Sequence, residues 1–341
     1  MRPVLPPQTL LLTHRDVAPL IDMREAIAVV EEAFRLKALG KVRMPPKLYV
    51  GLPEHEGDVR CMPVYVESWG LACVKVVNSH PRNPSARGLR SVMAVIELLD
   101  PSTGFPLAVM DGTLLTDLRT GAAGAVAAKY LAKPRVERLG LIGAGRQAQS
   151  QLQALFAAYG PSIKEVRVFD IVKRKAAALA SLAAEGYGLE ARAVDDPREA
   201  VGGMDVVVTT TPSRSPVVMG EWVSPGAHFN CIGADAPGKQ ELDPRILVRA
   251  KLVVDDVEQA VHGGEPNVPI AQGLLRREDI YAELGEVVAG LKPGRQAEDE
   301  VTVFSSTGLA VQDLAVAKLV YEKALRAGAG SLIELVPPSA S

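Results

Sequence analysis

The sequence predicts a two-domain fold that combines an α/β domain, built on a doubly wound parallel sheet, with an α+β domain. Three observations predict it. The chain has 341 residues, 48% of them apolar, which is enough for two sizeable cores. Its middle alternates short apolar runs with helical stretches, a pattern typical of parallel sheets. Its first third instead carries short strands separated by turn-rich pieces, which favours antiparallel pairing.

The first third begins with a short strand at 9–13 and continues with an amphipathic helix at 23–39. Asp22 and Glu25 have the spacing of a capping box at the start of this helix, and Gly40 suits its C-terminal cap. The further strands expected in this region lie at 47–52, 59–66, 71–77, 91–98 and 106–110.

The middle of the chain predicts a strand–helix alternation, and the last helix lies beyond it. The expected strands are 138–143, 165–170, 189–194, 205–211, 228–233 and 251–256, with helices at 146–159 and 173–186. The amphipathic segment 314–325 is expected to return to the first domain, and the tail after Gly328 to be loosely held. The predicted division is 1–118 with 308–341 for the α+β domain and 119–307 for the α/β domain.

Composition excludes several classes of protein. A net charge of −2 argues against non-specific binding to nucleic acid or to membrane surfaces, and 4% aromatic residues argue against a base-stacking platform. Cys61, Cys73 and Cys231 lie in separate apolar runs, which predicts reduced core residues and no disulfide framework or zinc site. The N-terminal apolar run is short and broken by prolines, so we expect no signal peptide, no membrane span and a cytoplasmic protein.

A dinucleotide-binding pattern follows the first strand of the middle block. Gly143, Gly145 and Ala148 form G-x-G-x-x-A between a strand and a helix, as in a Rossmann domain. The glycines allow a tight turn and close approach of a pyrophosphate to the helix N-terminus. The next strand ends in Asp170, where a carboxylate accepts from ribose hydroxyls and repels a 2′-phosphate, so NAD is favoured over NADP. Lys173, close behind, weakens that preference.

Lys75 interrupts the apolar strand segment LACVKVV. An unpaired ammonium in such a place costs several kcal/mol. Lys75 therefore either has an acidic partner or faces a cleft that binds an anion. His80, a few residues later, has no spaced partner for a triad or metal site and is expected to anchor a loop.

Nine sequence blocks resemble the ornithine cyclodeaminase/μ-crystallin family, and within it they are most similar to the archaeal-type alanine dehydrogenases. The blocks are MPPKLYV (44–50), RCMP (60–63), KVVNSHP (75–81), TGFPLAVMD (103–111), LRTGAAGAVAAKYLA (118–132), IGAGRQAQ (142–149), TTTPSR (209–214), IGADAPGKQELD (232–243) and STGLAVQD (306–313). They run in order across nearly the whole chain. The resemblance implies a Rossmann domain for NAD, a second domain that binds substrate and dimerises, and a homodimer.

The resemblance also assigns roles to single residues. Lys75 and Asp235 would be catalytic and face each other across the nicotinamide. Arg60 together with Lys75 would clamp the substrate carboxylate, and Arg119 would contact the cofactor phosphates, the substrate carboxylate, or both. Arg60 stands where the cyclodeaminases carry a glutamate for a distal amine. An arginine would repel a second ammonium and hold a carboxylate through two hydrogen bonds. The cofactor contacts that motif and resemblance together indicate are Arg119, Gly143, Gly145, Arg146, Gln147, Ala148, Asp170, Thr210, Ile232, Gly233, Ala234, Asp235, Lys239 and Ser306.

The expected function is therefore NAD-dependent oxidative deamination of L-alanine to pyruvate and ammonia, together with the reverse reductive amination. Two alternatives stay open. One is an enzyme of the same family, a ketimine reductase of the pyrroline-2-carboxylate type or an ornithine cyclodeaminase, and Arg60 speaks against the second of these. The other is a crystallin-like protein that binds NAD(P)H without catalysis. The sequence alone leaves the division of proton transfer between Lys75 and Asp235 open.

Overall fold

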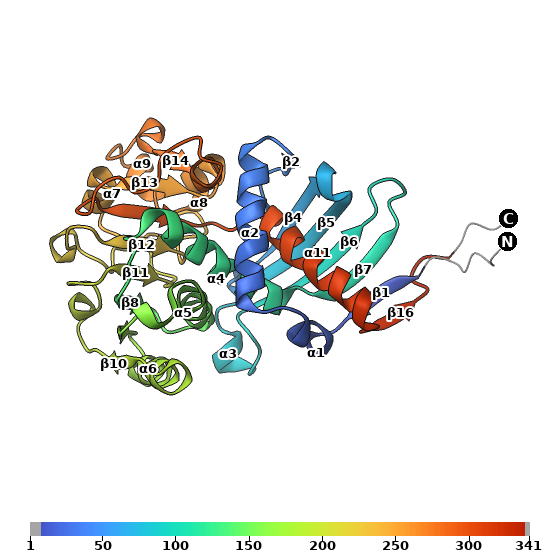
Figure 1. The fold of residues 1–341 in the computed structure, drawn as a ribbon, viewed down its shortest axis with the longest axis horizontal. Coiled ribbons are helices and arrows are strands. Elements are labelled where there is room, and N and C mark those ends of the chain that lie inside the picture. Colours follow the sequence, from blue (N-terminus) through green and yellow to red (C-terminus); the bar gives the residue numbers. More distant parts are fainter. Residues whose placement is uncertain (1–7, 338–341) are drawn as a thin grey trace. The chain divides into compact units, whose positions relative to one another are not determined.

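The computed structural model describes residues 8–337 of the chain. The chain divides into two compact units (Figure 1). Unit 1 comprises the residues up to Val29, Leu39–Arg119 and the residues from Leu309 onward, and unit 2 comprises Val30–Ala38 and Thr120–Gly308. Within the described residues, no helix has both the length and the apolar character needed to cross a membrane.

Unit 1 is built on a mixed sheet, called sheet A here. Among the described residues its strand order is β16-β1-β7-β6-β5-β4-β2, with β3 paired to β4. All the pairings are antiparallel except the parallel one between β1 and β7, which the sequence did not predict. The strands are β1 (Thr9–Leu12), β2 (Val42–Arg43), β3 (Leu48–Leu52), β4 (Gly57–Val66), β5 (Leu71–Ser79), β6 (Val92–Leu99), β7 (Pro106–Asp111) and β16 (Ser331–Ile333).

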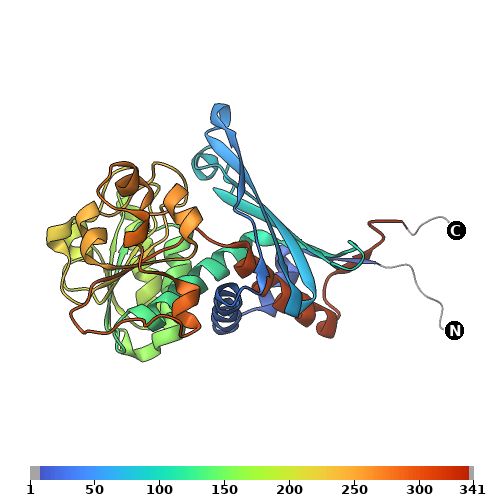
Figure 2. The same ribbon diagram turned by 90° about the horizontal axis from the view of Figure 1, so that it is seen from above.

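Helices cover one side of sheet A, and α11 (Ala310–Ala327) lies against β4, β5 and β6 (Figure 2). The shorter helices of this unit are α1 (His14–Val17) and α3 (Asn83–Ala86). Side chains on the other side of the sheet are exposed: Leu48 is 61%, Val76 45% and Val95 52% accessible. Sheet A therefore has one covered face and one open apolar face.

Unit 2 is the predicted doubly wound α/β domain. Its sheet B is entirely parallel, in the order β10-β9-β8-β11-β12-β15-β13-β14 among the described residues. The strands are β8 (Arg138–Ile142), β9 (Glu165–Phe169), β10 (Glu190–Ala193), β11 (Val206–Thr209), β12 (His228–Cys231), β13 (Lys251–Val254), β14 (Ala282–Glu283) and β15 (Thr302–Ser305). The helices are α5 (Arg146–Tyr159), α6 (Lys173–Tyr187), α7 (Pro244–Arg249), α8 (Val257–Gly263), α9 (Asn267–Ala271) and α10 (Leu284–Val288).

Separate apolar cores form on the two faces of sheet B. Val206 and Val208 of β11 point into a core completed by α5 and α6, whereas Val207 points into the opposite core, which includes α7 and α8. This alternation within one fully buried strand explains why the strands of unit 2 are continuously apolar. The predicted fold class, α/β with a second α+β domain, is confirmed.

Two helices span the division between the units. The helix α2 (Met23–Ala38) begins at the predicted capping box, in which the Glu25 amide donates to Asp22 at 2.9 Å. Its residues 30–38 group with unit 2, because Phe34 packs edge-on against Phe304 and Lys37 pairs with Asp256 at 3.0 Å. The sequence alone assigned this whole helix to the first domain.

The other shared helix, α4, and the C-terminal strand correct the sequence analysis. The sequence predicted a helix that Arg119 opens, whereas α4 (Gly112–Leu131) begins directly after β7 and Arg119 is its eighth residue. The segment Ser331–Ile333, within the tail expected to be loose, pairs with β1 as β16. Strands β14 and β15 were missed, because they are short and no helical pattern of the usual length precedes them.

Candidate active site

The residues predicted to contact the cofactor, except Arg119 of unit 1, lie along one edge of sheet B. Parallel pairing places Thr209 opposite both Ile142 and Cys231, Phe169 opposite Ile142, and Ser305 opposite Cys231. The next residue of each strand therefore falls in a row, in the order Asp170, Gly143, Thr210, Ile232 and Ser306. Adjacent strands lie about 4.8 Å apart, so the row spans roughly 19 Å. Strand order reverses between β8 and β11, where such sheets bind nucleotides.

The glycines of the row have the geometry that a pyrophosphate requires. Gly143 has a φ of +97°, and a side chain there would meet the Thr210 hydroxyl at 2.6 Å, so only glycine fits. At Gly145 an added Cβ would meet nothing within 4 Å, which leaves open space at the N-terminus of α5. Arg146, Gln147 and Ala148 form the first turn of that helix, with Ala148 buried in the core. The arrangement fits a dinucleotide, whose phosphates would face the helix N-terminus.

A pocket of about 410 Å³ adjoins the Asp170 end of the row. Asp170, Thr210 and Lys175 are among its lining residues. The Asp170 carboxylate accepts from the backbone amides of Ala144 at 2.8 Å and Val172 at 2.7 Å, which fixes its orientation. Lys173, which weakened the case for NAD, is paired with Asp195 at 2.6 Å.

The other end of the row carries Asp235 and Ser306. The Lys239 ammonium donates to Asp235 at 2.5 Å, so two predicted site residues form an ion pair with each other. Ser306 is buried and its amide donates to the Cys231 carbonyl. Asp255, which the sequence analysis missed, accepts from the backbone amides of Thr307 and Gly308 at 2.7 and 2.6 Å and fixes the turn after Ser306. Gly233 and Ala234, between Ile232 and Asp235, complete the predicted set at this end.

In unit 1, Lys75 lies on the covered face of β5 and is fully buried. Its ammonium is 2.7 Å from Oδ1 of Asp313, in the first turn of α11, and 3.5 Å from the Thr116 hydroxyl. Arg119 donates to the same Asp313 oxygen at 3.0 Å and to Gln312 at 3.1 Å. The acidic partner that the buried lysine required is therefore Asp313.

Positive charge exceeds negative charge in this cluster. Lys75 and Arg119 share one carboxylate, whose Oδ2 is buried and has no hydrogen-bond partner among the described residues. Burial, then the Arg119 charge, lower the pKa of Lys75 to about 7, although Asp313 acts in the opposite direction. Lys47, which the sequence analysis also missed, lowers it further. The cluster can bind an anion, and Lys75 can hold or release a proton near neutral pH.

Arg60 lies on the same face of sheet A as Lys75, because it is paired with Val77 while Lys75 is paired with Met62 on the adjacent strand. Its Nε and Nη2 each donate to Asp58 at 2.9 Å, and its guanidinium lies 5.2 Å from the centre of the Tyr49 ring. Asp58, another residue missed by the sequence analysis, already holds the forked edge that was expected to clamp a carboxylate.

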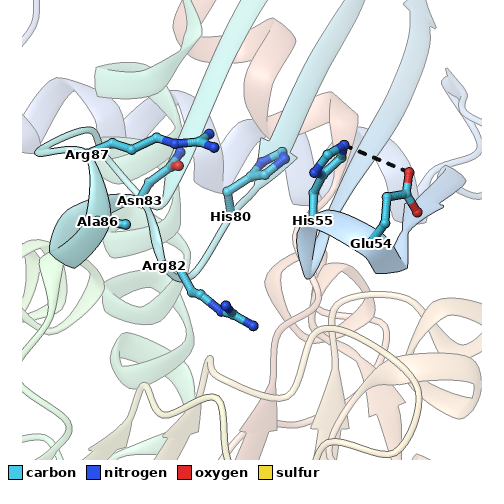
Figure 3. A pocket seen from close by; sticks show the side chains of 7 residues that line it. All are labelled: Glu54, His55, His80, Arg82, Asn83, Ala86 and Arg87. Atoms are coloured by element: carbon cyan, nitrogen blue, oxygen red, sulfur yellow. Dashed lines mark ion pairs between the residues drawn. The ribbon is translucent and has the colours of Figure 1, made fainter.

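Another pocket, of about 380 Å³, lies in unit 1 and is lined by none of the predicted site residues (Figure 3). The rings of His55 and His80 face it, and Arg82 turns away from them. The ring of His80 packs on Gly57, where a Cβ would lie 2.7 Å from it, and its backbone amide donates to the Ser91 carbonyl. His80 thus anchors its loop, in agreement with the sequence analysis.

Comparison with known proteins agrees with the resemblance read from the sequence. The sequence profile of the ornithine cyclodeaminase/mu-crystallin family matches residues 7–328. The chain belongs to this family. It is 54% identical to an alanine dehydrogenase of Archaeoglobus fulgidus over 327 residues, which cover 96% of this chain and 98% of the relative.

Two solved structures of the family are closely similar to the chain. One is an archaeal alanine dehydrogenase dimer with bound NAD, at 53% identity and a TM-score of 0.91, with 96% of this chain and all of the other covered. The second is the Δ1-pyrroline-2-carboxylate reductase of Thermococcus litoralis in complex with NADH and L-proline. It is 40% identical, with a TM-score of 0.92, and 95% of this chain and all of that one are covered. The names of these two proteins thus indicate that members of the family differ in substrate.

Proposed function

We propose that the protein catalyses NAD-dependent oxidative deamination of L-alanine to pyruvate and ammonia, and the reverse reductive amination. The observation that carries the proposal is the buried cluster around Lys75, with its excess positive charge and its lysine that titrates at about 7. A small amino acid has one carboxylate, which would balance the excess positive charge of the cluster. It also has an amine, to and from which Lys75 could transfer protons. The 54% identity to an archaeal alanine dehydrogenase supports the choice of alanine.

The row at the edge of sheet B would hold NAD. Gly143 and Gly145 leave room for its pyrophosphate, Asp170 accepts from ribose hydroxyls, and Ser306 marks the nicotinamide end. When bound, NAD supplies an acceptor for the α-hydride of the substrate. NAD is favoured over NADP because the fixed Asp170 carboxylate would repel a 2′-phosphate.

Lys75 and Asp235 are the residues proposed to move protons. Neutral Lys75 can accept a proton from the substrate ammonium or from the attacking water, and protonated Lys75 can return one to the departing amine. A pKa of about 7 suits both tasks at neutral pH. The ion pair with Lys239 orients the Asp235 carboxylate. The balance is alanine, water and NAD⁺ giving pyruvate, ammonium, NADH and one proton.

The substrate carboxylate would be held by Arg119 and Lys75, whose charges Asp313 offsets only in part. Arg60 would join them in clamping this carboxylate, after exchanging or sharing its bond to Asp58. A second ammonium would be repelled there, which speaks against ornithine.

We also propose that the protein forms a homodimer through the open face of sheet A. Register places Leu48, Cys61, Val76 and Val95 in one row across four strands of that face. Exposed apolar side chains in a continuous row are typical of a protein interface. The archaeal alanine dehydrogenase structure, a dimer, supports the same assembly.

A substrate panel tests the proposed activity against its alternatives. The purified protein is assayed with alanine plus NAD, pyruvate plus ammonia plus NADH, pyrroline-2-carboxylate plus NADH, and ornithine, with NADP and NADPH in parallel. Turnover of alanine and pyruvate supports the proposal. Turnover of the cyclic imine alone would make the protein a ketimine reductase, which the 40% identity to the Thermococcus litoralis reductase makes the best second candidate. NADH binding without any turnover would favour the crystallin-like alternative.

A further inference from the structure

A fully buried carboxylate, Glu241, lies behind the cofactor edge of sheet B. Its Oε1 accepts from the backbone amide and the hydroxyl of Thr211 at 2.5 and 2.8 Å. Its Oε2 accepts from the Thr209 hydroxyl at 2.7 Å and from the backbone amide of Gly233 at 2.8 Å. One side chain therefore receives four hydrogen bonds from the loops that follow β11 and β12.

These two loops carry the predicted cofactor contacts of the central row. The first contains Thr210, between the two threonines that Glu241 holds, and the second runs from Ile232 through Gly233 to Asp235. Gly233 has no room for a side chain: an added Cβ would lie 2.1 Å from the Thr211 carbonyl oxygen and 2.7 Å from the Glu241 carboxyl carbon. The loops are thus in contact with each other and share Glu241 as an acceptor.

A second buried acid holds Glu241 in turn. Oε1 of Glu265 accepts from the backbone amides of Glu241 and Leu242 at 2.9 and 2.6 Å, while its Oε2 has no hydrogen-bond partner among the described residues. Burial and the neighbouring Glu241 charge raise the pKa of Glu265 to about 8. Burial raises the pKa of Glu241 as well, but its four donors act in the opposite direction, so Glu241 is the acid of the pair better placed to carry negative charge and Glu265 the one better placed to carry a proton.

The cost of burying this charge argues for a role in the site. An ionised carboxylate away from water is stable only when donors surround it, and apolar packing would join two loops at lower cost. A carboxylate offers four directional contacts at once, which fixes loop positions more narrowly than apolar packing does. Because Glu241 is inaccessible, it acts through the loops and does not touch a ligand itself.

We infer that Glu241, backed by Glu265, is a positioning residue that fixes Thr210 and the Ile232–Asp235 loop in the conformation that binds NAD and presents Asp235. The inference rests on the proposed function for the identity of the cofactor. It assigns the four hydrogen bonds a purpose beyond stability, namely preorganisation of the cofactor edge.

The test is NADH binding to the Glu241→Gln variant, measured by the fluorescence of bound NADH. Glutamine keeps the shape but turns an NH₂ group toward the donors, so the loops separate. We expect the Kd for NADH to rise by about 10- to 100-fold and kcat at saturating NADH to fall about tenfold. A purely structural role would lower the melting temperature but leave the Kd of the folded fraction unchanged.

A milder variant and a control make the test decisive. Thr209→Val removes one of the four hydrogen bonds, with the other three intact, and should weaken NADH binding about threefold even if Glu241→Gln does not fold. Glu221→Gln makes the same chemical change at an exposed glutamate of unit 2 and should leave the Kd unchanged.

The outcomes separate this inference from the proposed function. If the folded variants bind NADH within twofold of the parent protein, the positioning role is wrong. If the parent binds NADH but does not oxidise alanine, only the alanine proposal fails, because the Kd comparison needs no turnover. If the parent binds no NADH at all, both are overturned.

Discussion

Replacing Asp313 by asparagine should shift the pH dependence of catalysis to lower pH. Asp313 lies 2.7 Å from the Lys75 ammonium and raises the pKa of Lys75, against the lowering effect of burial. An opposite charge at this distance shifts a pKa by about 1–3 units, so its loss should take the pKa of Lys75 from about 7 to about 4–6. Asparagine keeps an oxygen that can still accept from Lys75 and Arg119, so the change removes mainly charge.

The assay is kcat/KM for alanine from about pH 4 to about pH 10.5, with NAD saturating, so that the range covers both the shifted step and the amine of free alanine. Neutral Lys75 is the proposed base, so the rate of the parent protein should rise with pH through about 7. In the Asp313→Asn variant that step should move down to about pH 4–6, whatever the variant's absolute rate. The step caused by the amine of free alanine stays in place in both proteins and serves as an internal reference.

Two further variants fix the sign of the effect. Arg119→Gln removes a positive charge that lowers the pKa of Lys75. The rise of kcat/KM with pH should therefore move above pH 7 in this variant. Asp117→Asn is the control, because it removes a buried carboxylate of the same unit that is paired with Arg90. In this variant kcat/KM should still rise through about pH 7. A step that remains at about pH 7 in the Asp313→Asn variant would refute the assignment of this pKa to Lys75.

Four other variants test separate parts of the proposals. Lys75→Ala should lower kcat by about 10²- to 10⁴-fold and leave the Kd for NADH within about threefold; an active variant would remove Lys75 from the mechanism. Gly145→Ala should leave the melting temperature of the apoprotein unchanged, since its Cβ meets nothing within 4 Å, yet weaken NADH binding at least about tenfold in a direct titration. Asp170→Ala should reduce the ratio of kcat/KM for NAD to that for NADP at least about tenfold, and an unchanged ratio would contradict its role in selecting NAD. Val95→Glu, on the open face of sheet A, should convert the dimer to a monomer in sedimentation velocity, whereas a stable dimer would place the interface elsewhere.

Strands β8 to β13 of unit 2, with α5 and α6, could be predicted because local signals agree there with the tertiary structure. The strands are buried on both faces and read as continuous apolar runs, and α5 and α6 follow them at regular spacing. The start of α4 could not be predicted. Gly112, Thr113 and Thr116 are weak helix formers, and their helical conformation depends on packing against sheet A.

The row of predicted cofactor contacts at the edge of sheet B could be inferred from the sequence. Each of its residues directly follows a strand, and parallel pairing brings the ends of neighbouring strands together. The partner of Lys75 was not accessible. The sequence contains 40 acidic residues, and nothing local indicates which one lies beside a given lysine. Asp313 even falls within a recognised block, STGLAVQD, but without any sign of its contact. Glu241 was hidden in the same way, because three of its four donors come from Thr209 and Thr211, about 30 residues before it, and nothing in the block that it shares with Gly233 indicates the fourth contact.

The distance along the chain between Lys75 and Asp313 affects how the protein is made. The two residues are separated by 238 positions, and all but nine residues of unit 2 lie between the second and third segments of unit 1. On the ribosome, the strands of sheet A other than β16 therefore emerge long before α11, the helix that covers the sheet and supplies the acid for Lys75. Unit 2 can fold while its neighbour is still incomplete, which reverses the usual N-terminal-first order of domain folding. A chain that stops before α11 keeps an uncovered apolar sheet with an unpaired ammonium in it, so only full-length synthesis produces a stable unit 1.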